Sequence, residues 1–212
     1  MHFRDRHEAG RLLGKALADL GTAQDVVVLG IPRGGVVVAH EVATALSAPL
    51  DVYITRKIGA PFNSELAIGA VASDGTLVLD DDLVARVGAS ADYVEAETER
   101  QRREIERRIQ AYRGTSSTLQ LKDRTVILVD DGVATGATVL ASVRAIKQQE
   151  PKELIVAIPV GPADTIHVLE QEADRVVCLH TPEVFWAVGA FYEIFDQTSD
   201  EEVVRLLREH QS

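Results

Sequence analysis

The chain has 212 residues, of which 46% are hydrophobic, and a formal net charge of −11 from 22 basic and 33 acidic side chains. This length and apolar content predict a full buried core in a single domain spanning residues 1–212. The acidic balance argues against a nucleic-acid partner, because nonspecific binding to nucleic acid relies on a basic surface.

The cysteine content and the lengths of the apolar runs indicate the cellular compartment of the protein. Cys178 is the only cysteine, which excludes an intrachain disulfide and favours a reducing compartment. Within the run VVCL we interpret it as a small buried apolar residue rather than a nucleophile. No apolar run approaches the ~20 residues of a membrane span, and the N-terminus lacks a signal-peptide pattern. We therefore expect a cytoplasmic protein that needs no membrane.

The first part of the chain predicts a helix and then a strand-turn-helix unit. Residues 2–20 have helical apolar spacing, and the strand VVVLGI (26–31) runs into Pro32, Arg33, Gly34 and Gly35 before a helix to residue 46. Paired glycines let the backbone approach an anion closely, and the Arg33 guanidinium can bind a diphosphate. The alternative is a tight turn with a surface arginine.

A third strand and a hairpin follow. Residues 50–55 (LDVYIT) predict a strand that ends at the basic pair Arg56 and Lys57. The glycine, proline and polar residues of 58–65 predict a loop. Residues 66–72 and 76–79 flank the turn signal Ser-Asp-Gly (73–75), which predicts an antiparallel hairpin. The basic pair suits a polyanionic ligand, and a solvated strand end is the alternative.

A long charged helix is predicted over about residues 90–113, with Ser90 as its N-cap. Its apolar stripe is thin, so we expect one edge to be buried in the globule or in a subunit contact. Its arginines alternate with glutamates, which favours a solvated face over RNA binding.

The stretch VILVDDGVATGAT (126–138) organises the chain. Four apolar residues predict a strand covered on both faces, and two acids, Asp130 and Asp131, follow directly. A small-residue loop with two threonines then leads into a predicted helix (137–149). Free amides and the helix dipole attract a phosphate, while adjacent carboxylates accept hydrogen bonds from vicinal hydroxyls. The stretch therefore predicts a site for a phosphate beside a sugar.

Further strands (153–159 and 175–179) alternate with a helix (163–172), which predicts a doubly wound α/β fold with a mainly parallel sheet and ligand loops at the strand C-terminal ends. A last helix is predicted from residue 199 or 200 to 210. The aromatic segment EVFWAVGAFY (183–192) lies between them. Ordinary core packing is one interpretation of this segment.

The central stretch resembles the diphosphoribosyl-binding signature of type I phosphoribosyltransferases. The resemblance implies a flexible antiparallel flap over about residues 56–80 and a small C-terminal hood over about residues 181–212. It implies transfer of the 5-phosphoribosyl group from phosphoribosyl diphosphate (PRPP) to a nucleobase or other nitrogenous acceptor, with release of pyrophosphate. Such an enzyme would be a pentosyltransferase, in the glycosyltransferase class, of the kind used in nucleotide salvage.

The resemblance also implies roles for individual residues. Asp130 and Asp131 would hold the ribose hydroxyls, and residues 134–138 would wrap the 5-phosphate. The PRPP-binding residues would be Asp130, Asp131, Gly132, Val133, Ala134, Thr135, Gly136, Ala137 and Thr138. Arg33, Gly34 and Gly35 match the pyrophosphate loop, and Arg33, Arg56, Lys57 and Asp131 would carry the catalysis. Magnesium would arrive on PRPP, without dedicated protein ligands.

Two departures from the family pattern qualify these roles. Gly132 stands where a larger aliphatic residue is usual, which predicts a looser loop. Ala134 stands where enzymes acting on 6-oxopurines carry an aspartate, which argues against a hypoxanthine or guanine acceptor.

Phe185 and Trp186 could stack on the acceptor in the hood. Dimers are usual in the family, and the long helix offers a surface for a homodimer. A non-catalytic protein of the same fold that senses PRPP or a nucleotide is the alternative function. We find no nucleophile motif that supports a hydrolase.

Overall fold

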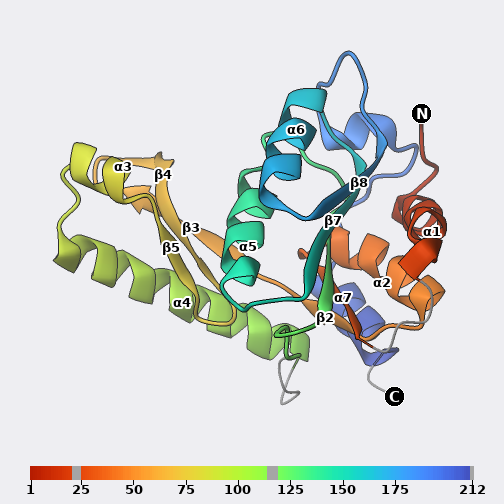
Figure 1. The fold of residues 1–212 in the computed structure, drawn as a ribbon, viewed down its shortest axis with the longest axis horizontal. Coiled ribbons are helices and arrows are strands. Elements are labelled where there is room, and N and C mark those ends of the chain that lie inside the picture. Colours follow the sequence, from red (N-terminus) through yellow and green to blue (C-terminus); the bar gives the residue numbers. More distant parts are fainter. Residues whose placement is uncertain (21–24, 114–118, 211–212) are drawn as a thin grey trace.

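A five-stranded parallel sheet forms the centre of the protein, and its strand order is β2-β1-β6-β7-β8 (Figure 1). The computed structural model describes residues 1–20, 25–113 and 119–210. The strands are β1 (Val26–Gly30), β2 (Leu50–Val52), β6 (Thr125–Val129), β7 (Glu153–Val160) and β8 (Arg175–His180). All neighbouring pairs are parallel, which confirms the predicted doubly wound α/β fold.

Helices cover both faces of this sheet. One face carries α1 (Arg6–Ala16), α2 (Gly34–Leu46) and α7 (Asp200–Arg208), and the other carries α5 (Ala137–Lys147) and α6 (Ala163–Glu172). Alternate residues of β6 point to opposite faces of the sheet. Ile127 and Val129 pack in the core beneath α1, α2 and α7, whereas Val126 and Leu128 pack in the core beneath α5 and α6. A strand covered on both faces needs an unbroken apolar run, which is why the four residues 126–129 are all buried.

The segment after β2 forms a second sheet, which is antiparallel. It contains β3 (Thr55–Ala60), β4 (Asn63–Ala72) and β5 (Leu77–Leu79), in the order β3-β4-β5. The predicted loop over 58–65 is therefore wrong, because these residues form the end of β3, a two-residue turn and the start of β4. The predicted strand 50–55 is also two strands, since β2 ends at Val52.

Gly59 explains the error. The register of β3 against β4 shifts on both sides of this residue, and a Cβ there would lie 2.8 Å from the Ser64 Cα. A glycine within a strand often marks a bulge or a close approach of two backbones. The turn predicted at residues 73–75 is confirmed, with Gly75 at a φ of 88°.

The predicted charged helix is α4 (Ala91–Arg113), which follows a short helix, α3 (Asp81–Arg86). The Ser90 hydroxyl accepts the Tyr93 backbone N–H at 3.2 Å, as expected of an N-cap. Figure 1 shows α4 running beneath the second sheet and reaching the end of the central sheet. Its residues Val94, Ile105 and Tyr112 are buried, so one edge of the helix does contribute to the core. No helix among the described residues has both the length and the apolar content needed to cross a bilayer.

The N-terminal segment lies beside residues 191–193, which precede the last helix. The first helix begins at Arg6 rather than at residue 2, because Asp5 caps it through the Glu8 N–H at 2.8 Å. Phe3 instead exchanges backbone hydrogen bonds with residues 191 and 193, at 2.8 and 2.9 Å, next to the 3-10 helix η2 (Val188–Phe191). A second 3-10 helix, η1 (Ala18–Leu20), follows α1. The last helix, α7, begins after Ser199 as predicted.

Candidate functional site

The two acids leave the carboxyl end of β6 at the middle of the central sheet. The Asp131 backbone N–H donates to the Asp130 carboxylate at 2.8 Å, so the two residues form one compact turn. Burial, and next the charge of the neighbouring Asp131, raise the pKa of the Asp130 carboxyl well above its usual value. The pair therefore needs positive charge nearby if both members are to stay ionised.

An arginine from the first helix supplies that charge. The Arg6 Nε donates to the Asp131 Oδ2 at 2.7 Å, and both side chains are mostly buried. The same guanidinium donates to the Asp196 carbonyl at 2.8 Å and lies 3.9 Å from the centre of the Phe195 ring. The Tyr192 hydroxyl donates to the Asp131 carbonyl at 2.6 Å. The N-terminal helix and the C-terminal segment thus hold the second acid from two sides.

The predicted glycine turn lies directly against the acid pair. A Cβ on Gly34 would overlap the Asp131 Oδ2, and one on Gly35 would lie 2.9 Å from the Asp130 Cα. Only residues without a side chain allow this contact between the N-terminus of α2 and the end of β6. Arg33, whose peptide bond to Pro32 is cis, points its guanidinium toward Asp200, with 3.7 Å between Nη1 and Oδ1.

The small-residue loop after the acids bends through two glycines in the left-handed region, Gly132 at φ 154° and Gly136 at φ 72°. Gly132 is buried, and a Cβ there would lie 2.5 Å from a methyl group of Val188. The expectation of a looser loop is therefore wrong, because η2 fills the space that a larger residue would need. Four loop residues are exposed at the surface: Ala134, Thr135, Ala137 and Thr138.

A cavity of about 660 Å³ connects this loop to the second sheet. Its walls include Thr135 and Thr138 on one side and Arg56 and Lys57 of β3 on the other. The Arg56 Nε donates to the Gln101 side chain of α4 at 3.0 Å. The structure therefore brings the predicted phosphate loop and the predicted basic pair to the same cavity.

Comparison with known proteins identifies the family. A model of the phosphoribosyl transferase domain matches residues 6–193, which is most of the chain. The chain belongs to the phosphoribosyl transferase family.

Relatives within this family are similar over nearly the whole chain. Two Mycobacterium tuberculosis proteins, from strains CDC 1551 and H37Rv, are each 46% identical over 97% of this chain and bear the name "putative phosphoribosyl transferase". The alignment covers 46% of each of those proteins, so this chain spans about half their length. The crystal structure of TT1426 from Thermus thermophilus is also 46% identical, covers 99% of both chains and superposes with a TM-score of 0.90.

The aromatic segment divides between core and surface. Phe185 stacks on Phe191 with 5.5 Å between ring centroids, and it packs against the small core that contains Phe3 and Tyr192. Trp186 is 86% exposed, and it is not among the residues that line the cavity beside the phosphate loop. The core interpretation of this segment thus holds for Phe185 and fails for Trp186. Cys178 is partly buried, and burial raises the pKa of its thiol.

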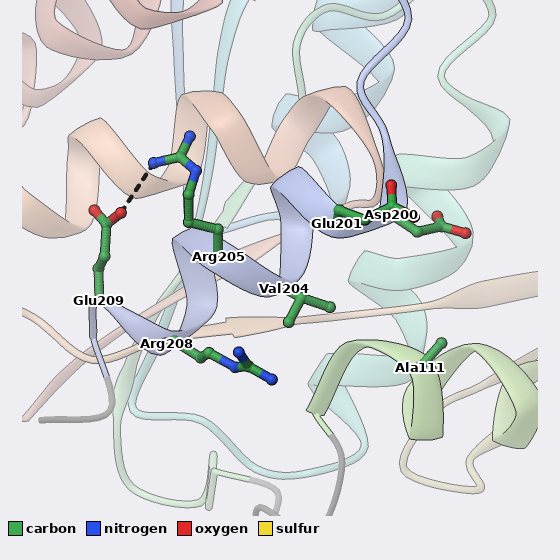
Figure 2. A pocket seen from close by; sticks show the side chains of 7 residues that line it. All are labelled: Ala111, Asp200, Glu201, Val204, Arg205, Arg208 and Glu209. Atoms are coloured by element: carbon green, nitrogen blue, oxygen red, sulfur yellow. Dashed lines mark hydrogen bonds and ion pairs between the residues drawn. The ribbon is translucent and has the colours of Figure 1, made fainter.

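A larger depression, of about 830 Å³, lies elsewhere, between α7 and Ala111 of α4. Figure 2 shows its charged side chains, with Arg205 paired to Glu209 at 2.9 Å and Asp200 at the opposite end of the helix. It contains none of the residues predicted for the site. The smaller cavity is the better candidate for the site, because the predicted phosphate loop and the predicted basic pair both line it.

Sequence patterns do not reveal Arg6. It stands in a polar N-terminal segment with several other charged residues, and nothing in its spacing distinguishes it from them. Tyr192 belongs by sequence to the aromatics of the hood, whereas its hydroxyl in fact bonds to the acid pair. Both roles depend on contacts between residues more than 60 positions apart, which local patterns do not encode.

Proposed function

We propose that this protein transfers the 5-phosphoribosyl group from PRPP to a nitrogenous acceptor and releases pyrophosphate. The observation that carries the proposal is the meeting of two motifs, the glycine turn after β1 and the acid pair after β6. Helix α2 leaves β1 toward one face of the sheet, and α5 leaves β6 toward the other. A crevice between such strands is where open α/β sheets bind their ligands.

Each part of this crevice suits one part of PRPP. The acid pair would accept hydrogen bonds from the two ribose hydroxyls, and residues 134–138 at the N-terminus of α5 would bind the 5-phosphate. The amides of Gly34 and Gly35 and the charge of Arg33 would bind the diphosphate. Arg56 and Lys57 would stabilise negative charge on the departing pyrophosphate.

The reaction would need no covalent intermediate on the protein. As the C1–O bond breaks, its electron pair leaves with pyrophosphate and positive charge develops on the ribose. The lone pair of an acceptor nitrogen forms the new bond at C1, and the proton lost from that nitrogen passes to solvent or to the released pyrophosphate. The protein would hold both reactants in line and stabilise the leaving charge. Such a reaction would make the enzyme a pentosyltransferase. The proposed role is nucleotide salvage, and the proposed place of action is the cytoplasm.

Magnesium fits this scheme as a part of the substrate. The described residues include no group of three or more His, Cys, Asp or Glu side chains suited to holding a metal ion. Asp130 and Asp131 are the carboxylates nearest to the proposed diol site, and they offer few ligands of their own. Magnesium bound to the diphosphate would neutralise part of its charge.

The side chain at position 134 bears on which acceptor the enzyme uses. Ala134 is exposed, and its carbonyl accepts a hydrogen bond from the Thr165 hydroxyl at 2.8 Å. A methyl side chain there cannot take a proton from, or donate one to, a purine nitrogen. We therefore propose an acceptor other than hypoxanthine or guanine, with the exposed indole of Trp186 available to stack on it.

Pyrophosphate release from PRPP and magnesium, measured across a panel of nucleobases and simple amines, tests the proposal. At least one acceptor is expected to support turnover. The variant Asp131→Asn is expected to lower kcat/KM on the order of tenfold to a hundredfold, because hydrogen bonds to a charged group are worth about 1.5–3 kcal/mol. Asp164→Asn, an exposed acid at the start of α6, is the matched control and should leave activity unchanged.

The alternative, a protein that senses PRPP or a nucleotide without turnover, gives a different result in the same samples. Calorimetry would then detect PRPP binding that weakens in Asp131→Asn, while no acceptor releases pyrophosphate. Absence of both binding and turnover would refute both functions.

A further inference from the structure

Arginine side chains of α4 line cavities that continue beyond the one beside the phosphate loop. The nearest, of about 390 Å³, shares Arg56 and Arg100 with that cavity. The next, of about 480 Å³, shares Arg107 with the second and reaches Pro32 and Arg33 of the glycine turn. A run of positive charge therefore extends from the phosphate loop to the glycine turn, in a chain whose net charge is −11.

The cavity at the glycine turn gathers three guanidinium groups, from Arg33, Arg107 and Arg108. Its lining is mostly polar. Asp200 lies at the same place, where it accepts the Tyr112 hydroxyl at 2.9 Å and faces Arg33 at 3.7 Å. In Figure 2 the Asp200 side chain lies at the end of α7 that faces away from Glu209.

One carboxylate holds both of the α4 arginines that line this cavity. Glu104 accepts from Arg107 at 2.9 Å and from Arg108 at 3.0 Å, and these hydrogen bonds lower the pKa of Glu104 to about 2. The two arginines are 69% and 35% exposed, so a ligand can reach them from solvent. Surface ion pairs of this kind contribute little stability, which leaves the guanidinium groups available to a more highly charged partner.

We propose that Arg107 and Arg108 join Arg33 in binding the diphosphate of the substrate, so that α4 forms one wall of the active site. This inference rests on the proposed phosphoribosyl transfer. Planar guanidinium groups bind phosphate oxygens in pairs, and a diphosphate presents more such oxygens than a single carboxylate does. Glu104 is the internal counterion that keeps the two arginines in place until the diphosphate replaces it.

Calorimetric titration with inorganic pyrophosphate and magnesium, at fixed ionic strength, tests this subsite directly. Ribose 5-phosphate is the second probe, because it lacks the diphosphate. Arg107→Gln and Arg108→Gln are each expected to weaken pyrophosphate binding about tenfold and to change ribose 5-phosphate binding less than about twofold. Arg102→Gln is the matched control, since Arg102 lies on the same helix, pairs with Glu99 at 2.8 Å and lines none of these cavities.

A variant that is expected to tighten binding distinguishes a role in the subsite from a role in folding. Glu104→Gln removes the competing carboxylate and is expected to tighten pyrophosphate binding several-fold, which a purely structural role of Glu104 would not produce. Unchanged pyrophosphate affinity in both arginine variants would overturn the subsite, and so would an equal loss for both probes. Weaker binding in Glu104→Gln would overturn the counterion role.

The same variants distinguish this inference from the proposed function. If the wild-type protein turns over PRPP and the arginine variants have the same KM for PRPP as the wild type, the transferase function is supported and the subsite is refuted. If the probes bind as expected but no acceptor releases pyrophosphate, the subsite stands and the transferase function falls.

Discussion

Replacing Arg6 by methionine removes the guanidinium from Asp131 while it keeps most of the length of the side chain. In the wild-type protein the Arg6 side chain is 12% exposed and that of Asp131 is 16% exposed. The substitution therefore leaves a largely buried carboxylate beside Asp130 without its ion-pair partner. It also removes the hydrogen bond to the Asp196 carbonyl and the contact with the Phe195 ring.

The expected loss of stability is about 3 kcal/mol near neutral pH, the lower end of the range for breaking a buried ion pair, because neither side chain is completely buried. For a chain of this size, that loss corresponds to a fall in Tm of about 6–12 °C. Arg6→Lys keeps the positive charge and is expected to recover part of the loss. Arg11→Met, on the same helix but half exposed, should change stability by no more than about 0.5 kcal/mol.

The loss should also depend on pH, with a definite sign. The Asp130 carboxyl has a raised pKa, so the folded state holds its proton more tightly than the unfolded state does. Its contribution to stability is therefore present at low pH and is lost as pH rises through the folded pKa. The charge of Arg6 lowers the pKa of Asp130 in the folded state. Removing Arg6 therefore raises that pKa, and stability continues to fall up to a higher pH. The penalty of Arg6→Met is thus larger at about pH 8 than at about pH 5.

Urea unfolding at these two pH values, followed by circular dichroism, measures both quantities. The wild-type protein, Arg6→Met, Arg6→Lys and Arg11→Met would be compared at equal ionic strength, with m-values checked for a common unfolding transition. Equal stability of Arg6→Met and Arg11→Met, or a larger penalty for Arg6→Met at the acidic pH, would refute the argument that the charge of Arg6 lowers the pKa of the Asp130 carboxyl.

Three further predictions concern the loop, the core and the hood. Gly132→Ala is expected to destabilise the protein by about 1–3 kcal/mol, and the added change Val188→Ala should recover part of this loss in urea unfolding; no recovery would mean that backbone strain alone is responsible. Arg113→Met breaks a pair with Asp51 in which both side chains are at most 7% exposed, and it should cost about 3–5 kcal/mol; Asp51→Leu added to it should restore stability, and a further loss would contradict this account. Trp186→Ala should leave Tm unchanged but raise the KM for the acceptor, and an unaltered KM would exclude stacking on this indole.

Local patterns predict those parts of the fold that depend on local physics. The apolar run before the acids fits a strand covered on both faces, and the β-turn-α order that follows implies a parallel sheet. The charged helix is also predictable, because its capping serine and its length are properties of the segment itself. The resemblance to a known signature then leads to the acid pair and to the phosphate loop.

Two of the errors share one physical cause, which is that a glycine has the same pattern whatever surrounds it. Gly59 suggests a loop, but it allows a close approach of β3 to β4 within a sheet. Gly132 suggests looseness, but its missing side chain makes room for Val188. The neighbour that explains Gly59 is Ser64 in the next strand, and the neighbour that explains Gly132 is Val188, 56 residues further along the chain.

The sequence by itself determined the strands of the central sheet and most helices, because hydrophobic periodicity and turn chemistry act over a few residues. Only the tertiary structure decided which charges meet. Arg6 reaches Asp131 across 125 positions, and Arg33 comes within reach of Asp200 from the other end of the chain. Such pairings follow from the packing of α1, α2 and α7 on one face of the sheet, and no short pattern records them.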